Sequence, residues 1–161
     1  MITMSKLSIV MFSGDLDKAL ASMIIANGAA ASGWDVTIFY TFWGIAMLRD
    51  PKKKAPKPKD TMSKMFGMML PNGPDKLKLS KMNMLGLGTS MMKGRMSAKK
   101  VQSLREMMKD AKELGVRFLI CDLSMTIMGL QKEEFSDIVD DYVGVGTYLS
   151  EAEKAEVNLF I

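Results

Sequence analysis

Two residue types that carry much of enzyme chemistry are scarce in this 161-residue sequence: histidine is absent, and cysteine occurs once, as Cys121. The absence of histidine excludes a Cys-His dyad, a Ser-His-Asp triad and a His-ligated zinc site. A single cysteine excludes an internal disulfide bond and fits a reducing compartment, so we expect a cytoplasmic protein. The residues point to neither a metal nor an organic cofactor.

Long apolar stretches are also lacking. The longest uncharged run, Ala19–Trp34, has 16 residues, whereas a membrane-spanning helix needs about 20. No apolar run leads to a small-residue cleavage site near the N-terminus, so no targeting segment is expected. These features favour a soluble protein.

Acidic residues are missing from Pro51–Lys59 ("PKKKAPKPK"), which holds five lysines. The net charge of +4 comes from this run, because the rest of the chain has 17 basic and 18 acidic residues. A neutral body argues against nucleic-acid binding, which needs a basic face on the folded domain. The run is either a solvated loop or a docking site for an acidic partner or an anionic membrane surface.

What the sequence does contain is an alternation of short apolar runs with helical patterns. The apolar runs predict strands at Leu7–Phe12, Val36–Tyr40, Val116–Ile120, Val139–Val143 and Val157–Ile161. Helices are predicted after Asp15, up to Leu48, over Ala98–Leu114, after Ser124, over Lys132–Phe135 and over Thr147–Ala155. This alternation implies right-handed crossovers and a doubly wound α/β domain with about five parallel strands.

Residues at about 50–97 interrupt this rhythm. The Lys/Pro-rich run is followed by a helical segment with Met62, Met65, Phe66 and Met69 on one face, and then by a Gly- and Met-rich segment. The chain has 18 methionines, and soft thioethers suit copper(I). The helical spacing instead favours packing against a core or a partner. We interpret the region as an insertion within one domain.

Cys121 falls at the edge of the sheet where function is expected, because ligands collect beyond the carboxyl ends of parallel strands. A short helix follows it, with Ser124 as the predicted N-cap. The positive end of a helix dipole and unpaired N–H groups can lower a thiol pKa without histidine, which would favour a reactive thiolate or a persulfide. The alternative is that Cys121 packs as a small hydrophobic residue, as free cysteines commonly do.

Nucleotide-binding loops are poorly matched. Gly86 and Gly88 begin a dinucleotide pattern that lacks its third glycine. The turn after the first strand carries Asp15 and Asp17, where a flavin phosphate would need hydroxyl and N–H donors. Flavin binding is therefore disfavoured.

Four segments in the same order carry a family resemblance. They are "TFWG" (Thr41–Gly44), "LSKMNMLGLG" (Leu79–Gly88), "CDLSMTIMG" (Cys121–Gly129) and "TYLSEAEKAEVNLFI" (Thr147–Ile161). The chain resembles the DsrE/DsrF-like proteins of sulfur relay over nearly its whole length, in the longer branch with an internal insertion. The resemblance implies a single domain, 1–161, with a three-layer αβα, flavodoxin-like fold that forms homo-oligomers.

The resemblance also implies a role for Cys121 as the residue that carries sulfane sulfur, as a persulfide. Rhodanese-type or TusA-type carriers are the implied partners. The chain has no second cysteine, so the acceptor thiol must lie on another molecule, and the protein is a sulfur carrier or a sulfurtransferase. The predicted pocket around the thiol comprises Gly14, Phe42, Trp43, Gly44, Asp122, Ser124 and Met125.

Residue roles within this pocket differ. Ser124 and Asp122 would orient the sulfur, although a carboxylate of Asp122 turned inward would raise the thiol pKa. Phe42 and Trp43 either wall the pocket or simply pack.

Two other classes of function stay open. The first is a non-catalytic oligomeric binding or scaffold protein, whose Met-rich insertion contacts a partner or a membrane surface while Cys121 is incidental. The second is a redox protein that uses Cys121 alone, which would need an external reductant to resolve a sulfenic acid.

Overall fold

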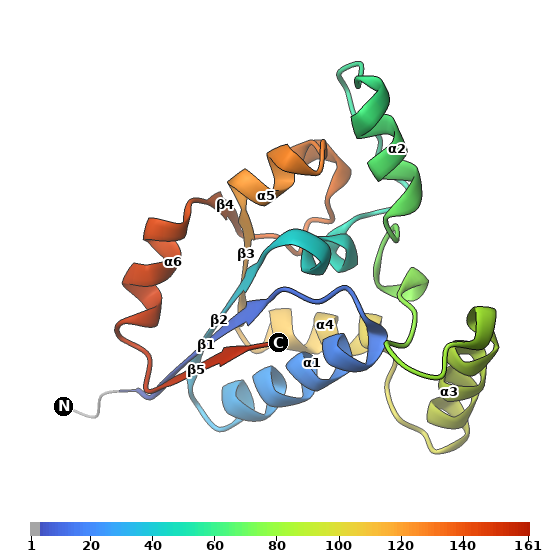
Figure 1. Ribbon diagram of the computed structural model, residues 1–161. Coiled ribbons are helices and arrows are strands. Elements are labelled where there is room, and N and C mark those ends of the chain that lie inside the picture. Colours follow the sequence, from blue (N-terminus) through green and yellow to red (C-terminus); the bar gives the residue numbers. More distant parts are fainter. Residues whose placement is uncertain (1–3) are drawn as a thin grey trace.

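The computed structural model describes residues 4–161, and its centre is a parallel sheet of five strands (Figure 1). The strands are β1 (Lys6–Met11), β2 (Asp35–Tyr40), β3 (Arg117–Cys121), β4 (Asp141–Val143) and β5 (Val157–Phe160). They lie in the order β4-β3-β2-β1-β5, and every neighbouring pair is parallel. Nearly continuous apolar runs produce these strands because both faces of a parallel sheet are buried.

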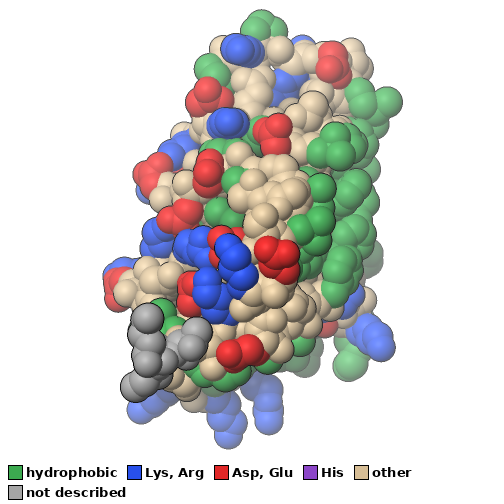
Figure 2. All heavy atoms as spheres, turned by 90° about the vertical axis from the view of Figure 1, so that its left-hand side faces the viewer, with side chains coloured by type: hydrophobic (Ala, Val, Ile, Leu, Met, Phe, Trp, Pro, Cys, Tyr) green, Lys and Arg blue, Asp and Glu red, His purple; other side chains and the backbone are tan. Residues whose placement is uncertain are grey.

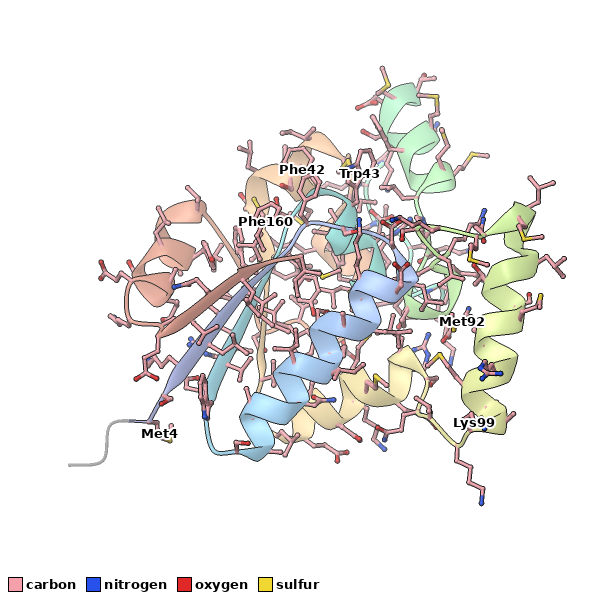
Figure 3. All side chains as sticks on the ribbon, turned by 60° about the horizontal axis from the view of Figure 1, so that its bottom comes forward. Met4, Phe42, Trp43, Met92, Lys99 and Phe160 are labelled. Atoms are coloured by element: carbon pink, nitrogen blue, oxygen red, sulfur yellow. The ribbon has the colours of Figure 1, made fainter. Side chains whose placement is uncertain are left out.

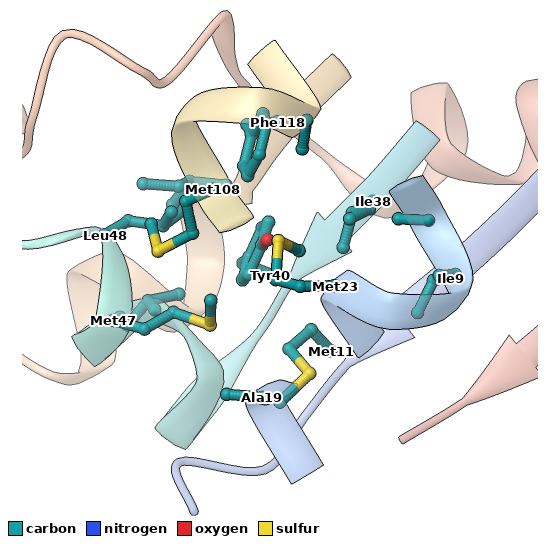
Figure 4. Packing of buried hydrophobic residues seen from close by; sticks show 14 of the residues in the cluster. Ile9, Met11, Ala19, Met23, Ile38, Tyr40, Met47, Leu48, Met108 and Phe118 are labelled. Atoms are coloured by element: carbon teal, nitrogen blue, oxygen red, sulfur yellow. The ribbon is translucent and has the colours of Figure 1, made fainter. Parts of the chain in front are cut away.

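The two faces of the sheet are covered unequally. Helices α1 (Leu16–Ala31) and α4 (Leu104–Glu113) pack side by side on one face, where the Asn27 side-chain amide donates to the carbonyl oxygen of Met107 at 3.0 Å. This face forms the main core, which includes Ile9, Met23, Ile38, Tyr40 and Phe118 (Figure 4). The other face is covered by α6 (Val145–Ala152) (Figure 1). The layers confirm the predicted three-layer αβα, flavodoxin-like fold.

The insertion forms two helices that stand away from the sheet, α2 (Thr61–Met69) and α3 (Leu87–Ala98) (Figure 1). Helix α2 has no buried residue, and Thr89 is the only buried residue of α3. Helix α3 lies in the Gly- and Met-rich segment, for which no helix was predicted because Gly88 and Gly94 are weak helix formers. Within residues 4–161, no helix has the length and apolar character needed to cross a bilayer.

The helix predicted over Ala98–Leu114 is wrong at its start. Helix α3 ends at Ala98, Lys100 has a left-handed backbone with φ 57°, and α4 begins only at Leu104. Ser103 is the reason for this boundary, because its side chain accepts the Glu106 N–H while the Glu106 carboxylate accepts the Ser103 N–H. Such a reciprocal cap fixes the first turn of a helix.

A buried arginine ties the insertion to the body. Arg49 follows the 3₁₀ segment Phe42–Leu48 (η1), and one of its guanidinium nitrogens donates to carbonyl oxygens at the end of α2, at 3.1–3.3 Å. The other terminal nitrogen lies 3.7 Å from the carboxylate of Glu134, which Lys59 contacts at 2.7 Å. Burial lowers the pKa of Arg49, and Glu134 opposes that shift.

We expect Arg49→Met to destabilise the protein by about 3–5 kcal/mol, because it leaves Glu134 and three carbonyl groups short of a buried donor. The measurement is urea unfolding followed by circular dichroism. The control is Arg105→Met, because Arg105 pairs with Asp75 on the surface and such pairs contribute no more than about 1 kcal/mol. Equal losses in the two variants would contradict a structural role for the buried pair.

Candidate functional site

The loops that follow β1 and β2 meet at the carboxyl end of the sheet. The Gly44 N–H donates to the carbonyl oxygen of Phe12 at 2.9 Å. A side chain on Gly44 would overlap the carbonyl oxygen of Met11, and a Cβ on Gly14 would lie 2.9 Å from the carbonyl oxygen of Trp43. Both glycines predicted for the site are therefore required for the two loops to approach each other.

An open cleft of about 710 Å³ lies beside these loops, and its lining includes Phe12, Gly14, Trp43, Phe160 and Ile161. It sits between the ends of β1 and β5, where the order of the strands reverses. Such switch points are the usual binding sites of doubly wound folds. The Ile161 carbonyl oxygen closes one side by accepting the N–H groups of Phe12 and Ser13, at 2.8 and 3.2 Å.

Aromatic side chains gather at this end of the sheet (Figure 3). The Phe12 ring lies 5.8 Å from the Phe42 ring and 5.7 Å from the Phe160 ring, measured between centroids. Phe42 adopts a left-handed backbone with φ 46° and is exposed, as is Trp43. The aromatics thus present an apolar surface rather than fill the core.

Cys121 is the last residue of β3 and lies beneath α6. It pairs with Val143 across the sheet and belongs to a small cluster with Phe39, Leu119, Val143 and Tyr148. The ring of Tyr148, from α6, stacks on Phe39 at 4.7 Å. Only 8% of Cys121 is exposed, so its thiol is largely screened from solvent.

Helix α5 (Asp122–Ile127) begins directly after the cysteine, so Cys121 occupies the N-cap position predicted for Ser124. Ser124 is instead buried inside α5, with its hydroxyl 2.6 Å from the Thr41 hydroxyl. This bond joins the β2 loop to α5. Helix α5 has only six residues, so its dipole is weaker than that of a full-length helix.

The predicted pocket residues fall into three places. Cys121, Asp122 and Ser124 share the end of β3, and Asp122 is exposed. Gly14 and Trp43 line the neighbouring cleft, while Phe42 packs between the two on Phe12. Met125 is buried in the main core on the opposite face from Cys121.

An ion pair between distant segments of the chain, which the sequence analysis did not predict, ties α6 to β3. Arg117, at the start of β3, donates to the Glu151 carboxylate of α6 at 2.6 Å. This hydrogen bond lowers the pKa of Glu151 and raises the pKa of Arg117. Among residues 4–161, no three His, Cys, Asp or Glu side chains lie where they could hold a metal ion.

Comparison with known proteins finds a matching family profile and relatives of nearly the same length. The profile of the DsrE/DsrF/DrsH-like family matches residues 3–160. The uncharacterized protein YrkE of Bacillus subtilis is 49% identical over 96% of this chain and 95% of its own length. The sulfur carrier protein DsrE2 of Allochromatium vinosum is 34% identical over 97% of this chain and 98% of its own.

A solved structure supports the fold alone. The protein of unknown function MTH1491 from Methanobacterium thermoautotrophicum has a TM-score of 0.55, with 12% sequence identity. The match covers 98% of this chain and 99% of that chain.

We expect Gly44→Ala to destabilise the protein by about 3 kcal/mol or more, because the added methyl group meets the backbone of Met11 rather than a side chain that can move. Gly146→Ala is the matched control. A Cβ at that helical position meets nothing within 4 Å, so alanine should stabilise α6 by about 0.5–1 kcal/mol. Thermal unfolding distinguishes the two, and an unaffected Gly44→Ala would refute the close approach of the loops.

We expect Glu151→Gln to cost up to about 1 kcal/mol at neutral pH. Because the folded-state pKa of Glu151 lies below its ordinary value of 4.5, its contribution is fully present above pH 4.5 and is lost as pH falls through the lowered value. The stability difference between wild type and variant, measured by urea unfolding from pH 7 to pH 3, should therefore vanish at low pH. Glu133→Gln, at an exposed position, is the control; a difference that persists in acid would argue against the ion pair.

Proposed function

The chain belongs to the DsrE/DsrF/DrsH-like family, and on this premise we propose that it is a sulfur carrier or sulfurtransferase that holds sulfane sulfur as a persulfide on Cys121. Similarity to the sulfur carrier protein DsrE2 supports a role in sulfur relay. The observation that carries the proposal for Cys121 is its position: the only thiol of the chain lies at the carboxyl end of β3, the edge where such folds bind ligands.

The transfer needs no external oxidant or reductant. The Cys121 thiolate attacks the outer sulfur of a donor persulfide, the donor S–S bond breaks, and the donor thiolate leaves with the electron pair. An acceptor thiolate then attacks the outer sulfur of the Cys121 persulfide, and the Cys121 thiolate is released. Each step exchanges one S–S bond for another, so the sulfur atom moves without net redox change.

Access to the thiol is the main structural requirement of this scheme. With Cys121 largely buried under α6, a donor or acceptor reaches the sulfur only when α6 shifts or from the open strand-end side. In the first route the Arg117–Glu151 pair, which ties α6 to β3, would have to open. Phe42 and Trp43, exposed at the adjacent strand end, supply an apolar surface for a docking carrier.

The partners follow from the single thiol. Because no second cysteine exists in the chain, donor and acceptor are other proteins, of the rhodanese type or the TusA type, or small persulfides. Assembly into a homo-oligomer is part of the proposal. A reducing cytoplasm would keep Cys121 free between transfers.

A second candidate is a scaffold role for the insertion. Helices α2 and α3 bury almost nothing against their own chain, which favours a contact with another molecule. In this case Cys121 would be a packing residue of the sheet.

We expect incubation with inorganic polysulfide to add one or more sulfur atoms to the wild-type protein. Intact-protein mass spectrometry measures the addition, which should be reversed by a thiol reductant and absent from Cys121→Ser. The loaded protein should then transfer its sulfur to an acceptor thiol in a single turnover. A wild-type protein that gains no sulfur while removal of α2 residues disrupts its assembly would replace the carrier proposal with the scaffold role.

A further inference from the structure

The segment Lys76–Lys100, which we call the Met arm, joins strong positive charge to exposed apolar side chains. It holds seven basic residues and no acidic residue, and none of the seven forms an ion pair among residues 4–161. Its exposed large apolar side chains are Met82, Met84, Leu85, Leu87, Met91 and Met92. Four of them, Met82, Met84, Met91 and Met92, line an open groove of about 760 Å³.

The backbone at the tip of the Met arm is strained in a way that keeps these side chains outward. Met82, Met84 and Leu85 have φ values of 58°, 46° and 57°, a region that costs a non-glycine residue about 1–2 kcal/mol. Leu85 is fully exposed. Asn83 holds this turn within the chain, because its carbonyl oxygen accepts the N–H groups of Gly86 and Gly88 and its side-chain oxygen accepts the Thr89 hydroxyl. The side chains of Met82, Met84 and Leu85 nevertheless stay exposed, so a contact with another surface could still cover them.

A second apolar surface lies at the other side of the molecule, on α5 and α6. Leu123 and Ile127 on α5, and Val145 and Leu149 on α6, form two exposed pairs at helical spacing. We call the surface formed by these four side chains the α5–α6 face; Cys121 lies beneath α6. Figure 2, viewed from the side of α6, shows charged, polar and hydrophobic side chains, with hydrophobic ones gathered along one edge of the molecule.

The α5–α6 face has the opposite charge bias. Helix α5 and helix α6 with its C-cap hold the acidic residues Asp122, Glu151 and Glu153 and no basic residue. Glu151 pairs with Arg117, whereas Asp122 and Glu153 form no ion pair among residues 4–161. Asp122 adjoins Leu123 in sequence, and Glu153 follows Leu149 by one helical turn.

We propose that the Met arm of one copy docks on the α5–α6 face of a second copy, beside Cys121. The Met arm and the α5–α6 face are both apolar and carry opposite charge. A contact between them would therefore remove both apolar surfaces from water and bring opposite charges together. They lie on opposite sides of the same chain (Figure 1), so they cannot meet within a molecule. The contact is head-to-tail, which closes into a ring or extends into a chain of copies.

An anionic lipid surface would fit the Met arm but not the molecule as a whole. Lipid binding would leave the apolar α5–α6 face uncovered and its carboxylates unpaired. A second copy satisfies both surfaces at once, with exposed side chains of the size of Leu149 available for the methionine-lined groove. This inference rests on the homo-oligomer proposed above and not on sulfur chemistry at Cys121.

Cross-linking between two variants tests the contact directly. Both carry Cys121→Ser; one adds Met91→Cys on the arm, and the other adds Leu149→Cys on α6. Both added thiols replace exposed side chains, so folding is not expected to suffer. A short bismaleimide should cross-link the two variants when they are mixed and give no cross-link in either alone. Cross-links in Met91→Cys alone would mean that arms meet arms and would overturn the proposal.

Charge reversal supplies an independent measurement. Lys81→Glu with Arg95→Glu should weaken self-association at least about tenfold in sedimentation equilibrium, a loss of about 1.4 kcal/mol. Mixing with a copy that carries Asp122→Lys and Glu153→Lys should restore association. The control reverses Lys52 and Lys54, which are exposed in the Lys/Pro-rich run, and should leave association unchanged.

Two outcomes would overturn the inference without touching the sulfur-carrier proposal. One is a wild-type protein that stays monomeric at high concentration and still loads sulfur on Cys121. The other is a monomer that binds phosphatidylserine vesicles through Lys81 and Arg95, which would assign the Met arm to lipid. Conversely, a head-to-tail cross-link in a protein that never takes up sulfur would leave the inference standing and remove the carrier role.

Discussion

A parallel sheet has to be covered on both faces, and in this protein one face is covered by a single eight-residue helix, α6. That unequal coverage explains several features together. Cys121 is buried only as deeply as α6 reaches, and the aromatic rings of Phe12, Phe42 and Phe160 at the strand ends stay open. The opposite face, under α1 and α4, carries the main core and most of the burial. Cys121 and the exposed aromatic surface thus fall on the same, thinly covered side of the sheet.

The insertion depends on polar contacts where the rest of the chain depends on packing. Helix α2 buries no side chain of its own, and the guanidinium of Arg49 holds its C-terminal carbonyl groups. Burying that guanidinium is favourable only because Glu134 and the carbonyl oxygens replace water around it. The insertion can therefore be held at a defined angle to the sheet while its methionines face outward.

The sequence was informative where local signals decide the structure. All five strands were predicted to within two residues of their observed bounds, because their apolar runs are short and end in turn residues. The strand-end rule placed Cys121 correctly. Local signals failed where a competing cap or a distant partner determines the local structure. The capping box of Ser103 and Glu106 makes α4 begin later in the sequence than predicted, and Ser124 is hydrogen-bonded to Thr41 instead of capping α5. Arg49–Glu134 and Arg117–Glu151 join segments far apart in sequence, and residue types alone do not reveal such pairs.

Because β1 pairs with β5, part of the sheet can form only after the end of this sequence has been synthesised. β1 precedes the other four strands in the sequence and lies inside the sheet, yet its outer partner, residues 157–160, follows all of them. Phe12 and Ser13 gain their hydrogen bonds only when the Ile161 carbonyl oxygen is in place. Contacts of such long sequence separation form slowly, since the entropy of closing the intervening loop is lost before they form. On the ribosome, the edge of β1 and the wall of the cleft are therefore the last parts to become native, and until then they offer an unpaired strand edge to which chaperones, or other nascent chains, can bind.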